Sequence, residues 1–138
     1  MSYRRLLVPI TAEPDSNRAV EVACSLASER AAELTAVFVI EISPLLPLDA
    51  RMDEDEALAR EALHRAQAVA DSFGVHLRAR KIRAREAGAA IVDLAEVLDA
   101  EVVVLAAPRK RRSHFGATVR KVLAKAPCPV LIASPPAV

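Results

Sequence analysis

Short apolar runs and stripes of apolar residues at helical spacing alternate along the whole chain. Residues 6–10, 34–40, 102–105 and 130–133 form mostly apolar runs, which are typical of strands buried on both faces. Residues 75–80 instead alternate apolar with polar positions, which predicts a strand with one solvent-exposed face at a sheet edge. The pattern therefore predicts five strands, with a helix between each strand and the next.

Four segments between these strands place apolar residues on one helical face. The residues expected to face inward are Ala19, Val22, Ala23, Leu26 and Ala27; Leu58, Ala62, Ala66, Val69 and Phe73; Ile91, Leu94, Ala95 and Leu98; and, after a helix start near Gly116, Val119, Val122, Leu123 and Ala126. Asp15 or Ser16 can cap the first helix, and Gly74 ends the second. Residues 43–52 hold two prolines and are expected to form a surface loop.

Such alternation requires right-handed crossovers and a parallel sheet with helices on both faces. The chain has 138 residues, which suits one domain over residues 1–138. A domain of this size buries roughly 68–70% of its unfolded surface, so it needs neither a metal nor a disulfide for stability. We therefore expect a single α/β domain with an open, five-stranded parallel sheet.

Composition excludes several functions. The net charge is only +1, and the chain has no Trp, one Tyr and three Phe, which disfavours nucleic-acid binding. The two cysteines, Cys24 and Cys128, are far apart, so we expect free thiols in a reducing cytosol rather than a zinc site. No segment resembles a signal peptide or a membrane span, which predicts a soluble, cytoplasmic protein. The spacing of residues in the sequence supports neither a Ser-His-Asp nor a paired-carboxylate arrangement, so we expect no enzymatic activity.

Three segments of the chain resemble the universal stress protein (UspA-like) family. They are RRLLVPI followed by an Asp-Ser helix start, REAGAAIVDLAEVLDAEVVVLAAP, and VRKVLAKAPCPVLIA, whose APCPVLI ending is the most specific. The resemblance covers essentially the whole chain. It implies a Rossmann-like sheet in the order 3-2-1-4-5 and a homodimer formed through the last strand, Val130 to Ala133.

The phosphate loop departs from the pattern of the family's ATP-binding members, G-x2-G-x9-G-[ST] after the fourth strand and an Asp after the first. Thr11 takes the place of that Asp, Ala106 stands for the first glycine, and Arg109 falls near the second in a shortened loop. Gly116 matches the third glycine, but Ala117 replaces the Ser that follows. Ala and Arg hinder the close approach of backbone to phosphate that glycine permits. The resemblance therefore implies that ATP binding in the family's usual mode is weak or absent.

The same loop offers other groups to an anion. Four consecutive cations, residues 109–112, lie beside the start of the fourth helix, where backbone N–H groups favour phosphate. In a phosphate site, Arg109 and Arg112 would hydrogen-bond to phosphate oxygens, next to Pro108 in the loop. The Thr118 hydroxyl, a few positions later in the sequence, could contribute as well. The alternative is a solvated surface loop, in which His114 is a plain exposed histidine rather than an anion ligand.

A nucleotide base would be lined by the backbone at Pro9, Ile10 and Val39, at the carboxyl ends of the first two strands. Thr11 would hydrogen-bond the nucleotide sugar, or alternatively satisfy the local turn. These residues complete the candidate nucleotide site.

The leading functional interpretation is a small regulatory or binding protein of the stress response, without a cofactor and without enzymatic activity. The alternative is a protein that binds ATP, AMP or cyclic AMP through its basic loop. A third interpretation is a regulatory domain for a membrane transporter. Residues 107–123, APRKRRSHFGATVRKVL, carry it, because they also resemble the universal-stress domains associated with amino-acid permeases and cation antiporters.

Overall fold

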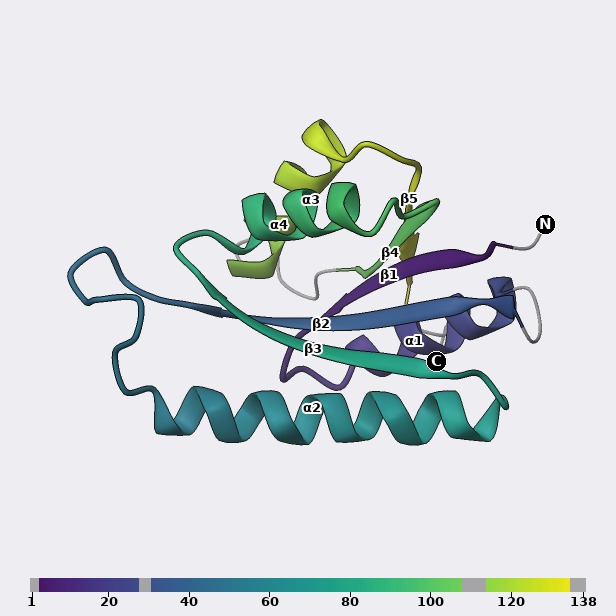
Figure 1. Ribbon diagram of the computed structural model, residues 1–138, viewed down its shortest axis with the longest axis horizontal. Helices are drawn as coiled ribbons and strands as arrows, with labels where there is room; N and C mark the ends of the chain where they lie inside the picture. The colour runs from purple at the N-terminus through teal and green to yellow at the C-terminus, as the bar shows by residue number, and fades with distance from the viewer. Residues whose placement is uncertain (1–2, 28–30, 108–113, 135–138) are drawn as a thin grey trace.

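The computed structural model describes residues 3–27, 31–107 and 114–134 (Figure 1). Strands and helices alternate along the chain, as the apolar pattern predicts. In chain order they are β1 (Arg5–Ile10), α1 (Ser16–Leu26), β2 (Glu33–Glu41), α2 (Asp53–Ser72), β3 (Leu77–Ala84), α3 (Ala87–Val97), β4 (Val102–Ala106), α4 (His114–Lys125) and β5 (Val130–Ala133).

The five strands form one parallel sheet in the order β3-β2-β1-β4-β5, which confirms the predicted topology. Leu6 of β1 lies between Leu34 of β2 and Val102 of β4 in the register. The chain leaves β1 toward β2 and later crosses back to β4, so the strand order reverses beside β1. In an open parallel sheet this reversal opens a crevice at the carboxyl ends of the strands.

Helices cover both faces of the sheet, with α1 and α2 on one side and α3 and α4 on the other (Figure 1). Successive residues of β1 serve opposite faces: Leu6 and Val8 pack on the α1 and α2 side, and Leu7 packs on the α3 and α4 side. All three side chains are almost fully buried. A strand buried on both faces shows no polar alternation, which explains the continuous apolar run in the sequence.

The buried helix faces differ in part from those predicted. Helix α2 buries four alanines, and the expected inward residues Leu58 and Phe73 are 42% and 48% exposed. In α4 the prediction for Leu123 was wrong as well, because its side chain faces solvent. Small side chains let a helix approach the sheet closely, so alanines take the inward positions while neighbouring leucines lie at the margin. The buried alanines of α2 are Ala59, Ala62, Ala66 and Ala70.

Of the two outer strands, β3 agrees with the sequence pattern, but the prediction that residues 130–133 are buried on both faces was wrong, because β5 lies at an edge of the sheet. β3 lies at one edge and exposes Arg78, Arg80 and Lys81, which confirms the predicted edge strand, although the strand extends to Ala84. Charged side chains on an edge strand oppose unwanted pairing with other chains. β5 lies at the other edge and leaves Leu131 and Ile132 more than one-third exposed.

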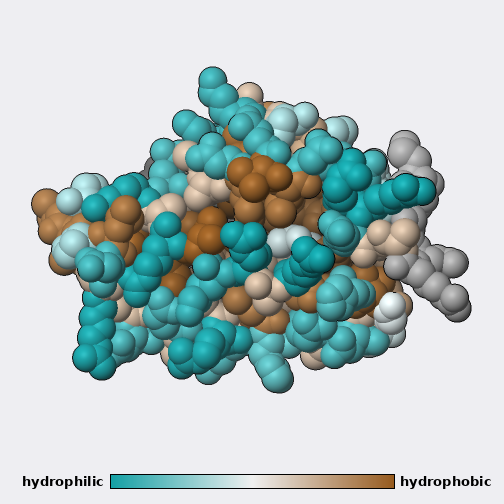
Figure 2. Space-filling view, in the orientation of Figure 1, coloured by the Kyte–Doolittle hydropathy of each residue, from teal (hydrophilic) through white to brown (hydrophobic). Residues whose placement is uncertain are grey.

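The connection from β2 to α2 is a surface loop, as predicted for residues 43–52. It displays three leucines, Leu45, Leu46 and Leu48, and Leu45 is 94% exposed. Figure 2 shows this end of the molecule as an apolar area at the left, where the loop turns in Figure 1. Arg85 holds the loop by donating hydrogen bonds to the carbonyl oxygens of Ser43 and Leu46, both at 2.6 Å.

No helix in the described ranges combines the length and the apolar character needed to cross a membrane.

Candidate ligand-binding cleft

A cleft of about 400 Å³ opens at the carboxyl ends of β1 and β2. Its size lies within the range of roughly 300–1,000 Å³ that is usual for small-molecule sites. The turn after β1, the end of β2 and the N-terminal parts of α2, α3 and α4 surround it. The lining residues are Thr11, Ala12, Glu13, Phe38, Val39, Ile40, Glu41, Asp55, Leu58, Ala87 and Thr118.

The cleft brings together Thr11, Val39 and Thr118, three of the residues that the sequence analysis selected. Gly116 and Ala117 lie in the first turn of α4, where Gly116 is buried and Ala117 is exposed. The parallel sheet accounts for this convergence, since the carboxyl ends of all the strands lie on the same side of the sheet and each following helix begins there.

Other predicted site residues do not line this cleft. Pro9 and Ile10 are buried within β1, and Ala106 is buried at the end of β4, where it pairs with Ala133 of β5. Pro108, Arg109 and Arg112 lie outside the described residues, so their part in a phosphate site stays a prediction. The side chain of His114 is likewise not described.

The turn after β1 is organised by Thr11 and Ser16. The backbone N–H of Thr11 donates to Ser16 Oγ at 2.8 Å, and Thr11 Oγ1 accepts from the backbone N–H of Glu13 at 3.1 Å. Asp15 occupies the N-cap position of α1 without a side-chain capping bond, so neither predicted cap forms. The Thr11 hydroxyl therefore satisfies its own turn, as the local alternative in the sequence analysis states.

Glu41 joins the end of β2 to the start of α3. Its Oε2 atom accepts a hydrogen bond of 2.7 Å from the backbone N–H of Ala87, the first residue of that helix. An anion at this point is favoured because the first N–H groups of a helix have no partner within it. Glu41 was not predicted from the sequence, although a carboxylate at the end of a buried strand was a usable signal.

Thr118 contributes a buried side chain to the lining of the cleft. Its side chain is 6% exposed, and no described residue hydrogen-bonds to the hydroxyl. The position of Thr118 depends on close packing between α3 and α4, since its carbonyl oxygen lies 3.5 Å from where a Cβ on Gly88 would stand. A buried hydroxyl without a protein partner is costly, and a ligand atom can satisfy it.

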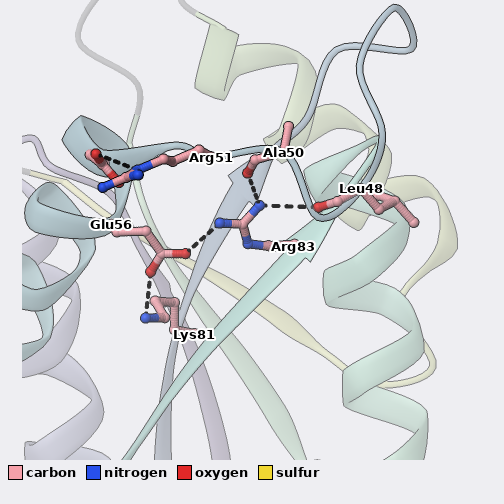
Figure 3. A network of polar contacts seen from close by, with 7 residues as sticks. Leu48, Ala50, Arg51, Glu56, Lys81 and Arg83 are labelled. Atoms are coloured by element: carbon pink, nitrogen blue, oxygen red, sulfur yellow. Dashed lines mark hydrogen bonds and ion pairs between the residues drawn. The ribbon is translucent and has the colours of Figure 1, made fainter.

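The first turn of α2 is fixed by ion pairs to β3 (Figure 3). Glu56 pairs with Lys81, and Arg83 Nη2 lies 2.9 Å from Glu56 Oε1. The hydrogen bond from Lys81, reinforced by that from Arg83, lowers the pKa of Glu56 below its ordinary value. Arg83 also donates to the carbonyl oxygens of Leu48 and Ala50. This network holds the helical turn that brings Asp55 and Leu58 to the cleft.

The thiols take no part in the cleft. Cys24 and Cys128 are free, and burial raises the pKa of Cys24 to about 11 and that of Cys128 above its ordinary value. No group of three or more metal-ligating side chains occurs within residues 3–27, 31–107 and 114–134. The described lining of the cleft offers a ligand carboxylates, two threonine side chains and apolar surface.

A comparison of the sequence with known protein families settles the relationship. The profile of the universal stress protein family matches residues 2–134. The chain belongs to the universal stress protein family. This assignment and the strand order agree with the family resemblance found in the sequence.

Individual universal stress proteins are similar to this chain in sequence and fold over nearly its whole length. One from Methanocaldococcus jannaschii is 28% identical over 143 residues, covering 97% of this chain and 84% of the relative. A solved structure from Archaeoglobus fulgidus has a TM-score of 0.77 at 27% identity, covering 96% of this chain and 94% of the other. A second structure from that organism, in complex with dAMP, has a TM-score of 0.76 at 24% identity, covering 96% and 98%.

Proposed function

We propose that this universal stress protein is a regulatory binding protein rather than an enzyme, and that its cleft binds an adenine nucleotide. We further propose that ATP is bound weakly or not at all in the family's usual mode. The cleft at the ends of β1 and β2 carries the proposal, because it joins an apolar surface to the buried Thr118 side chain at the carboxyl ends of the parallel strands.

The lining suits a flat, partly apolar ligand. Phe38, Val39 and Leu58 offer apolar contacts for a base, and Leu58 is half-exposed at the margin of the cleft. The Thr118 hydroxyl can donate to or accept from a polar ligand atom. The structure of an A. fulgidus relative in complex with dAMP supports adenine monophosphates as the first ligands to test.

The reason for weak ATP binding is the substitution of glycine in the phosphate loop. Ala106 and Arg109 replace two glycines of the family pattern, and a Cβ at either position hinders contact between backbone and phosphate. Arg109 and Arg112 are proposed to supply part of the lost contact through charge. Substituting either by alanine should then weaken nucleotide binding, and unchanged affinity would argue against this role.

Titration calorimetry with AMP, cyclic AMP, ADP and ATP tests the proposed function. Thr118→Val removes the hydroxyl while it keeps the shape of the side chain, and it should weaken binding about five- to tenfold, the value of one hydrogen bond. Thr35→Val is the matched control, because Thr35 is equally buried in β2 but does not line the cleft. The absence of saturable binding for all four nucleotides would overturn the proposal.

We also propose that two copies of the chain associate through β5. Support comes from the edge position of β5 and the half-exposed Leu131 and Ile132, since an apolar edge strand favours pairing with another strand. Ile132→Glu should convert a dimer to a monomer in light scattering after gel filtration. Leu45→Glu, at an exposed loop position, should leave the dimer intact. A monomeric wild-type protein at micromolar concentration would contradict this assembly.

Cytoplasmic location and a transporter partner stay predictions from the sequence. The transporter interpretation depends on residues 107–123, whose resemblance to transporter-linked domains is described above. A permease gene adjacent to the gene of this protein would favour it.

A further inference from the structure

We propose that three carboxylates in the cleft, those of Glu13, Glu41 and Asp55, select a nucleoside or nucleoside monophosphate over a nucleoside polyphosphate. This inference rests on the proposed function and names the class of ligand for the same site. The carboxylates would provide a second, electrostatic reason for weak ATP binding, in addition to the loss of glycines in the phosphate loop.

The described lining of the cleft is acidic. Glu13 comes from the turn after β1, Glu41 from the end of β2, and Asp55 from the first turn of α2, so the three carboxylates come from three elements. No Lys or Arg belongs to the described lining. Glu13 and Asp55 form no ion pair with a cation among the described residues, whereas the adjacent Glu56 is paired with Lys81 and Arg83. The described part of the lining therefore disfavours anions, whereas the four cations at residues 109–112 lie outside the described residues.

The anion position at the start of α3 is already taken within the protein. Glu41 Oε2 accepts the N–H of Ala87 at 2.7 Å, and both residues line the cleft. A ligand phosphate would have to displace this carboxylate or lie beside it, although a helix N-terminus is otherwise a favourable phosphate site. Glu41 thus places a carboxylate at a point where polyphosphate sites commonly use helix N–H groups without a protein partner.

The same groups suit a ligand that donates hydrogen bonds. Ionised carboxylates only accept, so sugar hydroxyls and an exocyclic amine are complementary to them, while additional phosphates are repelled. The Thr118 hydroxyl, buried and without a described partner, provides one further polar contact from α4. An adenosine or adenosine monophosphate matches this lining better than ATP does.

Titration of the full chain with adenosine, AMP and ATP, at low ionic strength and without Mg²⁺, tests the inference. Mg²⁺ is left out because it would neutralise the phosphates. The variants are Asp55→Asn, Glu41→Gln and Glu13→Gln, each of which removes one charge and retains an acceptor oxygen. Glu54→Gln is the matched control, since Glu54 lies in the same helical turn as Asp55 but is exposed and outside the cleft. Thermal unfolding of each variant confirms that it is folded.

Each cleft variant should raise the affinity for ATP relative to AMP by roughly two- to tenfold, an effect that falls with added salt. The affinity for adenosine should stay the same or decrease, and Glu54→Gln should change none of the ratios. Unchanged ratios in all three cleft variants, with AMP bound normally, would overturn the inference and leave the proposed function standing. If only the variants bind nucleotides, the carboxylates exclude them as inferred, and the proposed function fails for the wild type. If no variant binds any of the three ligands, both fail.

Discussion

Gly88 controls how closely α3 approaches α4. A Cβ built on Gly88 would lie 2.6 Å from Lys121 Cβ and 2.7 Å from Lys121 Cγ. Carbon atoms pack best about 3.5–4.0 Å apart, so an alanine at this position is about 1 Å too close. The Cβ of Lys121 is fixed to the backbone of α4, which means that the whole helix, and not a flexible side-chain tip, must move.

Two effects of Gly88→Ala oppose each other. Alanine favours the helix by about 1 kcal/mol over glycine. Overpacking of a tight contact costs about 1–3 kcal/mol, and this overlap is severe enough to reach the upper part of that range. We therefore expect Gly88→Ala to lower the free energy of unfolding by about 1–2 kcal/mol. Since Thr118 is carried by α4, nucleotide affinity should fall as well.

Urea unfolding of single and double variants measures this effect. Lys121→Gly removes the clashing Cβ, so the double variant with Gly88→Ala should be more stable than the sum of the two single changes. Lys121→Ala keeps the Cβ and should give a smaller rescue, which makes it the control. If Gly88→Ala is as stable as the wild type, or more stable, then α3 and α4 do not approach each other as closely at Gly88 and Lys121 as the structure shows.

Three further predictions concern the core, the thiols and the response to acid. Leu7→Ala should lower the free energy of unfolding by about 2–5 kcal/mol, because Leu7 is fully buried, whereas Leu45→Ala in the exposed loop should change it by less than about 0.5 kcal/mol in urea unfolding. In a thiol-reagent assay at pH 8, Cys128 should react before Cys24, whose deeper burial raises its pKa to about 11; equal rates would contradict the burial. The pKa of Glu101 is lowered from 4.5 by two backbone N–H groups, so its stabilising effect is complete above pH 4.5 and is lost as the pH falls through the folded pKa. Glu101→Gln should flatten the acid side of a stability-pH curve, and an unchanged curve would show that these bonds do not contribute.

The sheet was predictable because burial on both faces leaves a direct trace in the sequence. Leu6, Leu7 and Val8 are consecutive and serve opposite faces, so a continuous apolar run is sufficient to mark a central strand. Alternating elements then require parallel pairing through crossovers. The strand order itself came from the family resemblance and is confirmed by the structure.

The helix faces were less predictable, since alanine is found both inside and outside proteins. The burial of Ala62 and Ala66 in α2 was predicted correctly. Hydrophobicity, however, favoured Leu58 and Phe73 as inward residues, whereas the structure buries Ala59 and Ala70 instead. The distance between helix and sheet decides, because only small residues fit where the helix lies close. Leu58 is half-exposed for a further reason, as it lines the cleft.

The sequence by itself determined the alternating elements, the crevice at the strand ends, and Thr11, Val39 and Thr118 as residues near it. Only the tertiary structure decided that Glu13, Glu41 and Asp55 meet there, since they come from three elements and share no motif. The hydrogen bond from Ala87 to Glu41 spans 46 positions of the chain and has no local sequence pattern. Charges that gather from distant segments depend on packing geometry, and this is why the three carboxylates of the described lining come together only in the folded chain.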